Sequence, residues 1–149
     1  MRTLMTAMAL AVFAGGSISV TARAAETATV KIEVVGLRNQ KGSVRLALWN
    51  SKDGFPKDSE KAARRFRLPI VDGKASLVVD GLVAGDWAIA AFHDENDNGV
   101  FDLGLFGIPK EGMACSRDAR NRFGPPSFDQ AKIPLRAGEQ TLTLRVVYP

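Results

Sequence analysis

Apolar and polar residues alternate with a period of two along most of the chain. Val30, Ile32 and Val34 alternate with Lys31 and Glu33, and similar runs follow. Because a strand places alternate side chains on opposite faces, each run predicts a half-buried β-strand. The pattern predicts seven strands, at residues 30–34, 44–48, 66–71, 74–80, 87–93, 128–135 and 140–147.

Two short polar connections predict β-hairpins. Residues 38–42 separate the first two strands, and Asp72-Gly73 separates the third from the fourth. A type I′ turn needs positive φ at both central residues, and Asp-Gly is favoured there. Helical periodicity is confined to residues 59–65, which predict one or two short polar turns.

Short strands joined by Gly and Asp turns are typical of an all-β protein, since sheets with one apolar face pack face to face. We expect a single β-sandwich domain over residues 25–149, with a small closed barrel as the competing architecture. The domain is preceded by a segment of a different kind.

Residues 1–24 have the pattern of a secretory signal peptide. Arg2 precedes an uncharged apolar run at residues 4–14, and Ala22-Arg23-Ala24 matches a small-x-small cleavage site. The apolar run falls short of the roughly 20 residues that cross a bilayer. We expect cleavage before Ala25 and a periplasmic or secreted protein without a membrane span.

Composition and charge narrow the class of partner. The 149 residues are 46% hydrophobic and 24% charged, which is typical of a globular protein. The net charge of +4 includes Arg2 and Arg23, so the rest of the chain has a near-neutral balance of +2 and no nucleic acid partner is expected.

The single cysteine, Cys115, forms no internal disulfide. We expect a buried small hydrophobe there, with a reactive thiol or an intermolecular link as alternatives.

Residues 94–127 form a long segment without a clear strand or helix pattern, and connections of this length are usually functional or disordered. Its apolar content favours an ordered loop that folds back on the sandwich. The apolar residues are Phe101, Leu103, Leu105, Phe106, Ile108, Met113 and Phe123.

The start of this loop has the spacing of a calcium site, D-x-N-x-N-G-x-x-D. A hard cation needs oxygen ligands at loop positions 1, 3, 5, 7 and 9, with a glycine at position 6 for the sharp turn. Gly99 has that position. The candidate ligands are Asp94, Asn96, Asn98, the main-chain carbonyl of Val100, and Asp102.

The match to a helix–loop–helix calcium site is incomplete, because Leu105 stands where a bidentate Glu is expected. Glu111 or water would complete the ligand shell, and we expect an affinity on the order of 10⁻⁴–10⁻³ M. Glu95 and Asp97 would point outward and add negative field, and Phe101 would anchor the loop. The competing interpretation is an Asx-rich turn that stabilises itself by side-chain to backbone hydrogen bonds.

Other candidate chemistry is weaker. A hydrolytic triad of His93, Asp94 and either Ser116 or Ser127 lacks a G-x-S-x-G motif, so we expect no enzyme. Alternation puts His93 on the same strand face as Trp87, where we expect it to orient the start of the loop by hydrogen bonding.

An aromatic and proline-rich run at residues 123–128 is a candidate platform for a peptide or sugar, although such runs are more often rigid connectors. The candidate binding residues are Glu111, Phe123 and Phe128. A nearby basic cluster would meet an anionic ligand or form a solvated face; it consists of Arg117, Arg120 and Arg122.

Several motifs follow one another in a family-specific order. They are G-x-V-R-L-A-L-W-N at residues 42–50, Phe55-Pro56, L-x-x-G-D-W-A-I-A-A-F-H-D-E-N-x-N-G-x-x-D at 82–102, F-G-I-P-K-E-G at 106–112 and F-G-P-P-S-F-D-Q-A at 123–131. The chain thereby resembles the exported bacterial proteins grouped as domain of unknown function 2141. The resemblance implies a seven-stranded antiparallel Greek-key β-sandwich of the transthyretin or carboxypeptidase-regulatory type. It implies no activity, and residues 113–116 depart from the family pattern.

Our main hypothesis is an exported, non-enzymatic β-sandwich whose 94–102 loop binds Ca²⁺ and orders the long loop for contact with an envelope protein or surface. The alternative is a carbohydrate- or peptide-binding module without metal that uses the loop aromatics and Trp49 or Trp87. A hydrolase around His93 is the third hypothesis.

Overall fold

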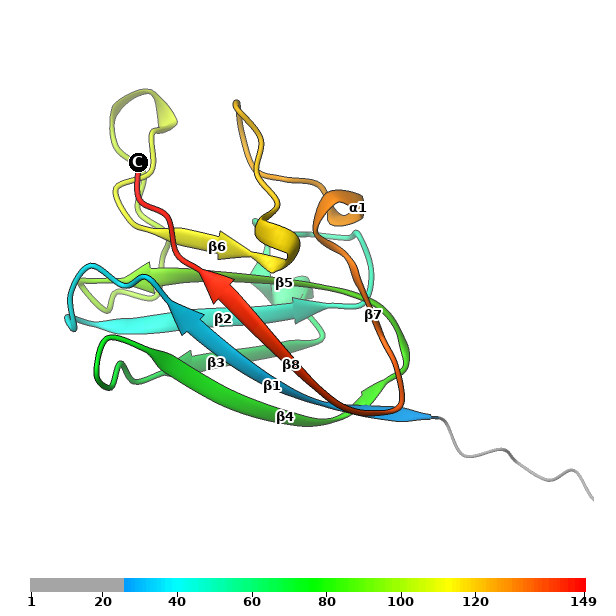
Figure 1. The fold of residues 1–149 in the computed structure, drawn as a ribbon. Coiled ribbons are helices and arrows are strands. Elements are labelled where there is room, and N and C mark those ends of the chain that lie inside the picture. The colour runs from blue at the N-terminus through cyan, green and yellow to red at the C-terminus, as the bar shows by residue number, and fades with distance from the viewer. Residues whose placement is uncertain (1–25) are drawn as a thin grey trace, which may run out of the picture.

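Two β-sheets of eight strands in all make up the described part of the chain, residues 26–149 of a computed structural model (Figure 1). The predicted signal peptide, residues 1–24, and its cleavage site before Ala25 lie outside the described residues. Within residues 26–149, no helix has the length and apolar character needed to span a bilayer.

The first sheet has three strands in the order β4-β1-β8, namely β4 (Ala75–Val83), β1 (Thr27–Val35) and β8 (Gly138–Arg145). β4 pairs with β1 antiparallel, but β1 and β8 are parallel, with Ile32 opposite Leu142. The prediction of a purely antiparallel sandwich is therefore wrong for this pair. The chain reaches β8 by a long return through the second sheet, so it enters beside β1 in the same direction.

The second sheet has the order β3-β2-β5, with β3 (Arg64–Leu68), β2 (Ser43–Trp49) and β5 (Gly85–Asp94). Two short strands share the other edge of β5. β6 (Met113–Cys115) pairs with residues 90–92, and β7 (Ile133–Leu135) pairs with residues 85–87. β6 was not predicted, and it brings the seven predicted strands to eight.

The two predicted hairpins are crossovers between the sheets. Asp72 and Gly73 both have positive φ, and Val71 and Lys74 form a bridge, as the type I′ prediction requires. The strands then diverge, because β3 pairs with β2 and β4 pairs with β1. β1 and β2 likewise lie in different sheets, so residues 38–42 do not close a hairpin.

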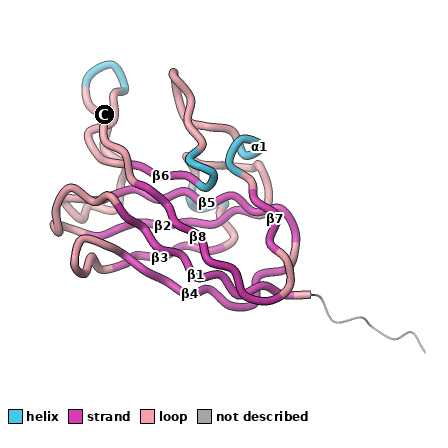
Figure 2. Tube along the Cα trace, in the orientation of Figure 1, coloured by secondary structure: helices cyan, strands magenta, loops and turns pink. Residues whose placement is uncertain are grey.

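Short elements interrupt two segments for which the sequence pattern predicts something else (Figure 2). The predicted strand 128–135 is the helix α1 (Phe128–Ala131) followed by β7, because Ser127 and Gln130 form a capping box. The long loop contains η2 (Leu105–Gly107), β6 and η3 (Ser116–Asp118). The predicted polar turn is present as η1 (Ser59–Lys61).

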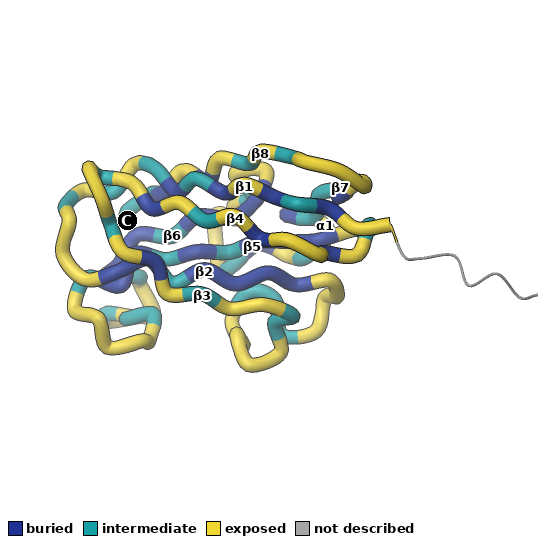
Figure 3. Tube along the Cα trace, turned by 90° about the horizontal axis from the view of Figure 1, so that it is seen from below, coloured by how far each residue is buried: buried dark blue, intermediate teal, exposed yellow. Residues whose placement is uncertain are grey.

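The main core lies between the two sheets, where the buried positions of neighbouring strands face one another (Figure 3). Val30, Ile32 and Val34 of β1 are fully buried, as the alternation predicts. A second cluster forms on the outer face of the second sheet, where Ala88, Cys115 and Ala131 are buried. α1 therefore covers β5 and β6 from outside, and β2 is buried on both faces.

Candidate functional site

Asp94 is the last residue of β5 and its side chain is fully buried at the start of the loop 94–102. Its Oδ1 accepts a hydrogen bond from the N–H of Asn98 at 3.0 Å, and its Oδ2 accepts one from Gly99 at 2.8 Å. Oδ2 also accepts from Nε of Arg45 on β2 at 2.9 Å. Three donors thus bind one buried carboxylate, and the two main-chain N–H groups among them fold the loop over the strand end.

The other predicted side-chain ligands converge on Asp102. Asn96 Nδ2 donates to Asp102 Oδ2 at 2.7 Å, and Asn98 Nδ2 donates to both carboxylate oxygens at 3.2 Å. Each amide oxygen closes an Asx turn, since Asn96 Oδ1 accepts from the N–H of Asn98 and Asn98 Oδ1 accepts from Val100. The sequence spacing therefore does gather the predicted residues, and it also forms the self-stabilised turn of the competing interpretation.

The oxygens present fit a hard cation only after a local change. The amide nitrogens of Asn96 and Asn98, rather than their oxygens, face Asp102. Rotation of each amide about χ2 would present oxygen in place of nitrogen. Among residues 26–149, no three His, Cys, Asp or Glu side chains form a metal-binding group, so a cation here would depend on amide and main-chain oxygens.

Glu111 holds the two ends of the loop together. Its buried carboxylate accepts from the N–H of Glu95 through Oε1 and from the N–H of Asp102 through Oε2, each at 3.1 Å. Burial raises the pKa of Glu111, the N–H donors lower it, and the charges of Asp102 and Asp94 raise it further. Both oxygens are used by the backbone, so Glu111 acts on the loop as a clamp.

The outward acids of the loop are neutralised by arginines. Asp97 accepts from Arg67 and from Ser43 Oγ, and these bonds lower the pKa of Asp97 to about 2. Glu95 pairs with Arg38 at 2.5 Å. Asp97 is exposed and points outward as predicted, but Glu95, with only 19% of its side chain exposed, turns toward Arg38 and Asn39. The arginine side chains cancel much of the negative field that the sequence spacing predicts for both acids.

Phe101 packs against Phe92 of β5 with ring centroids 5.5 Å apart, which is the predicted anchor. His93 is fully buried and acts at a different place from the predicted one. Its Nδ1 lies 2.7 Å from Tyr148 Oη and its Nε2 lies 2.7 Å from the carbonyl of Lys41. His93 thus links the C-terminal segment to the turn before β2.

The hydroxyl and thiol groups near β6 serve the fold. Ser116 Oγ accepts from the N–H of Ile89 at 2.9 Å and donates to the carbonyl of Ala131 at 2.6 Å. Ser127 caps α1. Cys115 is buried, and burial raises the pKa of its thiol to about 12.

The aromatic candidates are separated. Phe123 is 86% exposed at the end of a loop, whereas Phe128 packs edge-on against Phe55 with centroids 6.0 Å apart. Trp49 and Trp87 are buried, so neither offers a free face to a sugar or peptide. Phe123 is the one candidate of this group that faces solvent.

Most apolar residues of the long loop do not fold back on the sandwich as predicted. Phe101 and Met113 are partly covered, but Leu105 and Phe106 are 82% and 99% exposed. Phe106 also has positive φ, a conformation that residues other than glycine rarely adopt. Hydrophobic patterning identifies the apolar content of the loop but not the direction of these side chains.

A cleft of about 180 Å³ lies between the segments on either side of β6. Pro109 lines one side, Arg120 and Asn121 line the other, and Arg145 and Tyr148 come from the C-terminal segment. Sequence analysis missed this cleft, since its residues are far apart in the chain and meet through the β5–β6 pairing.

The comparisons with known proteins place the chain in a family without giving it an activity. A family model described as "Uncharacterized protein conserved in bacteria (DUF2141)" matches residues 32–143, which include all five metal-ligand candidates and most of both sheets. No curated protein matches the sequence.

Two solved structures are similar over most of this chain. They are a cysteine-to-alanine mutant and a second crystal form of a pilus-presented adhesin, Spy0125 (Cpa), at 13% identity and with TM-scores of 0.25 and 0.23. The matches cover 84% and 83% of this chain and 27% of the adhesin chain. The chain spans about a quarter of the adhesin's length. TM-scores this low show neither a shared fold nor a shared function.

Proposed function

The chain belongs to the DUF2141 family, and from this premise we propose that it is an exported, non-enzymatic β-sandwich protein whose 94–102 loop binds Ca²⁺. One observation carries the calcium proposal: Asn96 and Asn98 converge on the Asp102 carboxylate, with Asn98 also bound to Asp94. Ca²⁺ takes six to eight oxygen ligands in flexible geometry, so a loop with two carboxylates, two amides and a carbonyl suits it when water completes the shell.

The charge around the loop sets the expected affinity. Asp94 shares its charge with Arg45, so Asp102 supplies most of the attraction. Few free carboxylates mean weak binding, on the order of 10⁻⁴–10⁻³ M. Such an affinity would suit a compartment outside the cytoplasm, where the signal peptide pattern would send the protein.

Calcium at Asp102 would stiffen the segment that follows it. Leu103 bridges to Pro109, and the N–H of Lys110 donates to the carbonyl of Asp102 at 2.9 Å. The base of the exposed loop 103–109 is thus attached directly to the proposed ligand. Ca²⁺ would order this loop for contact with an envelope protein or surface.

The test compares thermal unfolding and calorimetric heat for the full chain in EDTA and in millimolar Ca²⁺. A ligand that binds only the folded state raises its stability, by about 1.4 kcal/mol at ten times Kd. Asp102→Asn should abolish that rise, and Asp118→Asn, an exposed acid in another loop, should keep it. Identical melting curves in EDTA and calcium, with no heat of binding, would end the calcium proposal.

The second candidate is a carbohydrate- or peptide-binding module without metal, and the exposure of Phe123 is the observation that favours it. Because Trp49 and Trp87 are buried, such a module would depend on the exposed loop aromatics, Phe123 and Phe106. Saturation-transfer NMR against a glycan and peptide panel tests it. A transfer signal that disappears in Phe123→Ala but persists in Phe128→Ala would support a site at the loop end, and an empty panel would count against it.

Export and topology are separate proposals. Protein recovered from cells that express the full-length gene should begin at Ala25 when its mass is measured, and an intact Met1 would contradict the signal peptide. A Greek-key relation to transthyretin-like domains is proposed from the family resemblance alone.

A further inference from the structure

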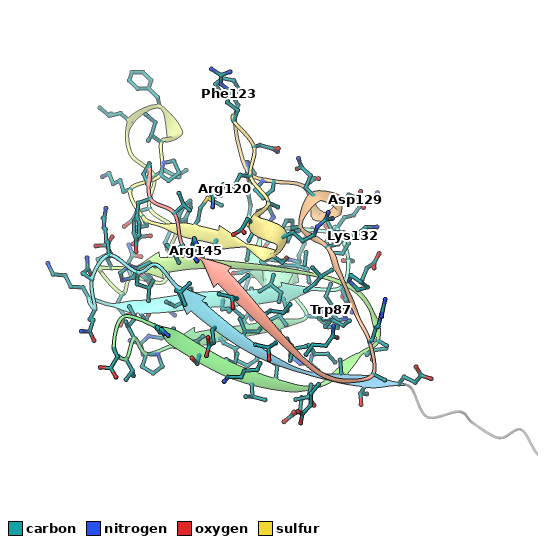
Figure 4. All side chains as sticks on the ribbon, viewed as in Figure 1. Trp87, Arg120, Phe123, Asp129, Lys132 and Arg145 are labelled. Atoms are coloured by element: carbon teal, nitrogen blue, oxygen red, sulfur yellow. The ribbon has the colours of Figure 1, made fainter. Side chains whose placement is uncertain are left out.

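Two loops end in exposed apolar side chains on the same side of the sandwich. We call residues 103–109 and 120–126 the tip loops; both project beyond β6 (Figure 1). Phe106 and Leu105 lie in the first and Phe123 in the second, with 99%, 82% and 86% of their surface exposed. Figure 4 shows Phe123 at the far end of its loop. Leu103 and Ile108 add further exposed apolar surface to the first tip loop.

The tip loops are held in shape by their own backbone contacts. In the first, the N–H of Gly104 donates to the carbonyl of Ile108 at 2.6 Å, and Leu103 bridges to Pro109. In the second, Asn121 Nδ2 donates to the carbonyl of Pro125 at 2.9 Å. These contacts hold both tip loops in a shape that leaves their apolar side chains exposed. Such exposure is unusual, because burial of apolar surface is the main favourable term in folding.

Four cations lie within residues 103–126, which contain both tip loops, and the guanidinium carbon of Arg122 lies 5.7 Å from the centroid of the Phe123 ring. Lys110, Arg117, Arg120 and Arg122 are all exposed, and none forms an ion pair with an acidic side chain in the described part of the chain. Residues 103–126 contain these four cations and two acids, a net of +2, which equals the whole net charge of residues 26–149. The other described residues, 26–102 and 127–149, contain 14 cations and 14 acids, so their net charge is zero.

In the second tip loop, the order of groups from the end inward matches a lipid surface. Phe123 is outermost, and Arg120 lies nearer the sheets, where it lines the cleft between the loops (Figure 4). In a bilayer, apolar and aromatic groups enter the boundary of the acyl chains while Lys and Arg stay at the anionic headgroups. A protein groove would need one continuous apolar face, whereas these are two separate protrusions with cations between them.

We propose that the tip loops dock this protein on a bilayer that contains anionic lipids, with Phe106 and Phe123 inserted and the four cations at the headgroups. The proposal does not depend on calcium, because the cations belong to the chain itself. It assigns the loop cluster 103–126 a partner of stated chemistry, an anionic phospholipid surface.

Depth-dependent fluorescence tests the insertion. Full-chain Phe106→Trp is mixed, in EDTA, with vesicles of phosphatidylglycerol and brominated phosphatidylcholine. The matched control is Val78→Trp, because Val78 is 56% exposed on β4, on the opposite side of the sandwich. Residues 1–25 are present in both variants, so binding through them affects both equally. We expect quenching of the tip tryptophan to be at least about twofold greater than that of the control, since inserted side chains reach the acyl boundary.

Charge substitutions test the lipid class. Arg120→Gln with Arg122→Gln should weaken binding to anionic vesicles by about 30-fold, the effect of two cations near an anionic surface. Arg64→Gln with Arg65→Gln on β3 should change it little. Equal quenching at positions 106 and 78, equal binding to purely zwitterionic vesicles, or no effect of the Arg120 and Arg122 substitutions would each overturn the proposal. A tryptophan at position 106 that stays exposed to water would instead indicate that the tip loops bind a protein or a glycan.

Discussion

Arg45 donates a hydrogen bond from Nε to Oδ2 of the buried Asp94 carboxylate at 2.9 Å, which puts a cation directly beside the candidate calcium loop. Arg45 lies on β2 and Asp94 ends β5, and the antiparallel register places Ser43 opposite Asp94. The first ligand of the proposed metal site is therefore paired with an arginine. A Ca²⁺ ion bound at this loop would have to share the Asp94 carboxylate with Arg45.

Arg45→Met removes this cation while keeping the apolar part of the side chain. We expect a loss of about 1.5–3 kcal/mol in unfolding free energy in EDTA, because a buried charge loses a charge-assisted hydrogen bond. Arg64→Met, at an exposed position on β3, should stay within about 0.5 kcal/mol of the parent. Urea unfolding measures both. If calcium binds, its stabilising effect should be larger in Arg45→Met than in the parent, and an unchanged stability in EDTA would contradict the role given to Arg45.

Asp97 should make stability depend on pH at the acid end. Its pKa falls from 3.8 to about 2 because Arg67 and Ser43 bind the ionised form. A lowered pKa in the folded state adds stability that is complete above pH 3.8 and lost as the pH falls through about 2.

Asp97→Asn tests this with little change in the backbone, since Asn tolerates the positive φ of this position. The difference in stability between parent and variant should be constant from about pH 5 to about pH 7 and should shrink as the pH approaches 2. High salt should reduce it as well, because the pair is exposed. A difference that grows on acidification would contradict the assignment.

Glu111→Gln should loosen the loop. A Gln side chain has one acceptor oxygen, so either the N–H of Glu95 or that of Asp102 loses its partner and faces an NH₂ group. We expect a cost of about 1–3 kcal/mol, as for an unpaired buried donor. Amide hydrogen exchange at residues 95 and 102 should speed up, while exchange in β1 should change only as far as global stability changes.

Glu111 should also make the unfolding free energy depend on pH, in the opposite direction to Asp97. Burial raises the pKa of Glu111 in the folded state, so the folded protein binds this proton more tightly than the unfolded chain. Its contribution to stability therefore falls as the pH rises from 4.5 through the raised pKa. Glu111→Gln should remove that part of the pH dependence from urea unfolding curves.

Gly42→Ala should be among the most damaging single-methyl changes in the chain. Gly42 has φ of +66°, and a Cβ there would lie 1.9 Å from the carbonyl oxygen of Asp94. We expect a loss of about 3 kcal/mol or more, from a left-handed residue and a clash with the backbone.

Gly73→Ala is the matched control, because Gly73 also has positive φ but has open space around it. It should cost about 1–2 kcal/mol, the strain of a left-handed alanine alone. Thermal unfolding of the two variants separates the clash from the strain. Equal losses would mean that the approach of Gly42 to Asp94 does not constrain the fold.

Much of the local structure follows from local patterns. The alternation at Val30, Ile32 and Val34 predicts β1 and its buried face, since side-chain direction in a strand depends only on position parity. Asp72-Gly73 predicts its turn because both residues tolerate the positive φ that a type I′ turn needs. The missed helix α1 also had a local indicator, the Ser127 to Gln130 capping box.

Strand partners and side-chain direction at the loop ends were outside the reach of such patterns. A turn can be correct while its strands part into different sheets, because pairing depends on which edges are free elsewhere in the fold. The exposed Phe106 shows the same limit, since hydrophobicity alone argues for burial while 99% of the residue is exposed in the structure.

In the candidate loop, some contacts follow from the local sequence and others depend on the tertiary fold. Local spacing alone brings Asp94, Asn96, Asn98 and Asp102 to one place, because alternate residues of a tight loop around a glycine face the same interior. The pairing of Arg45 with Asp94, the neutralisation of Asp97 and Glu95 by arginines, and the clamp of Glu111 on both loop ends depend on the tertiary fold. These partners come from β2, β3, the connection before β2 and the chain beyond the loop, and they meet it only because long-range strand pairing brings those segments together.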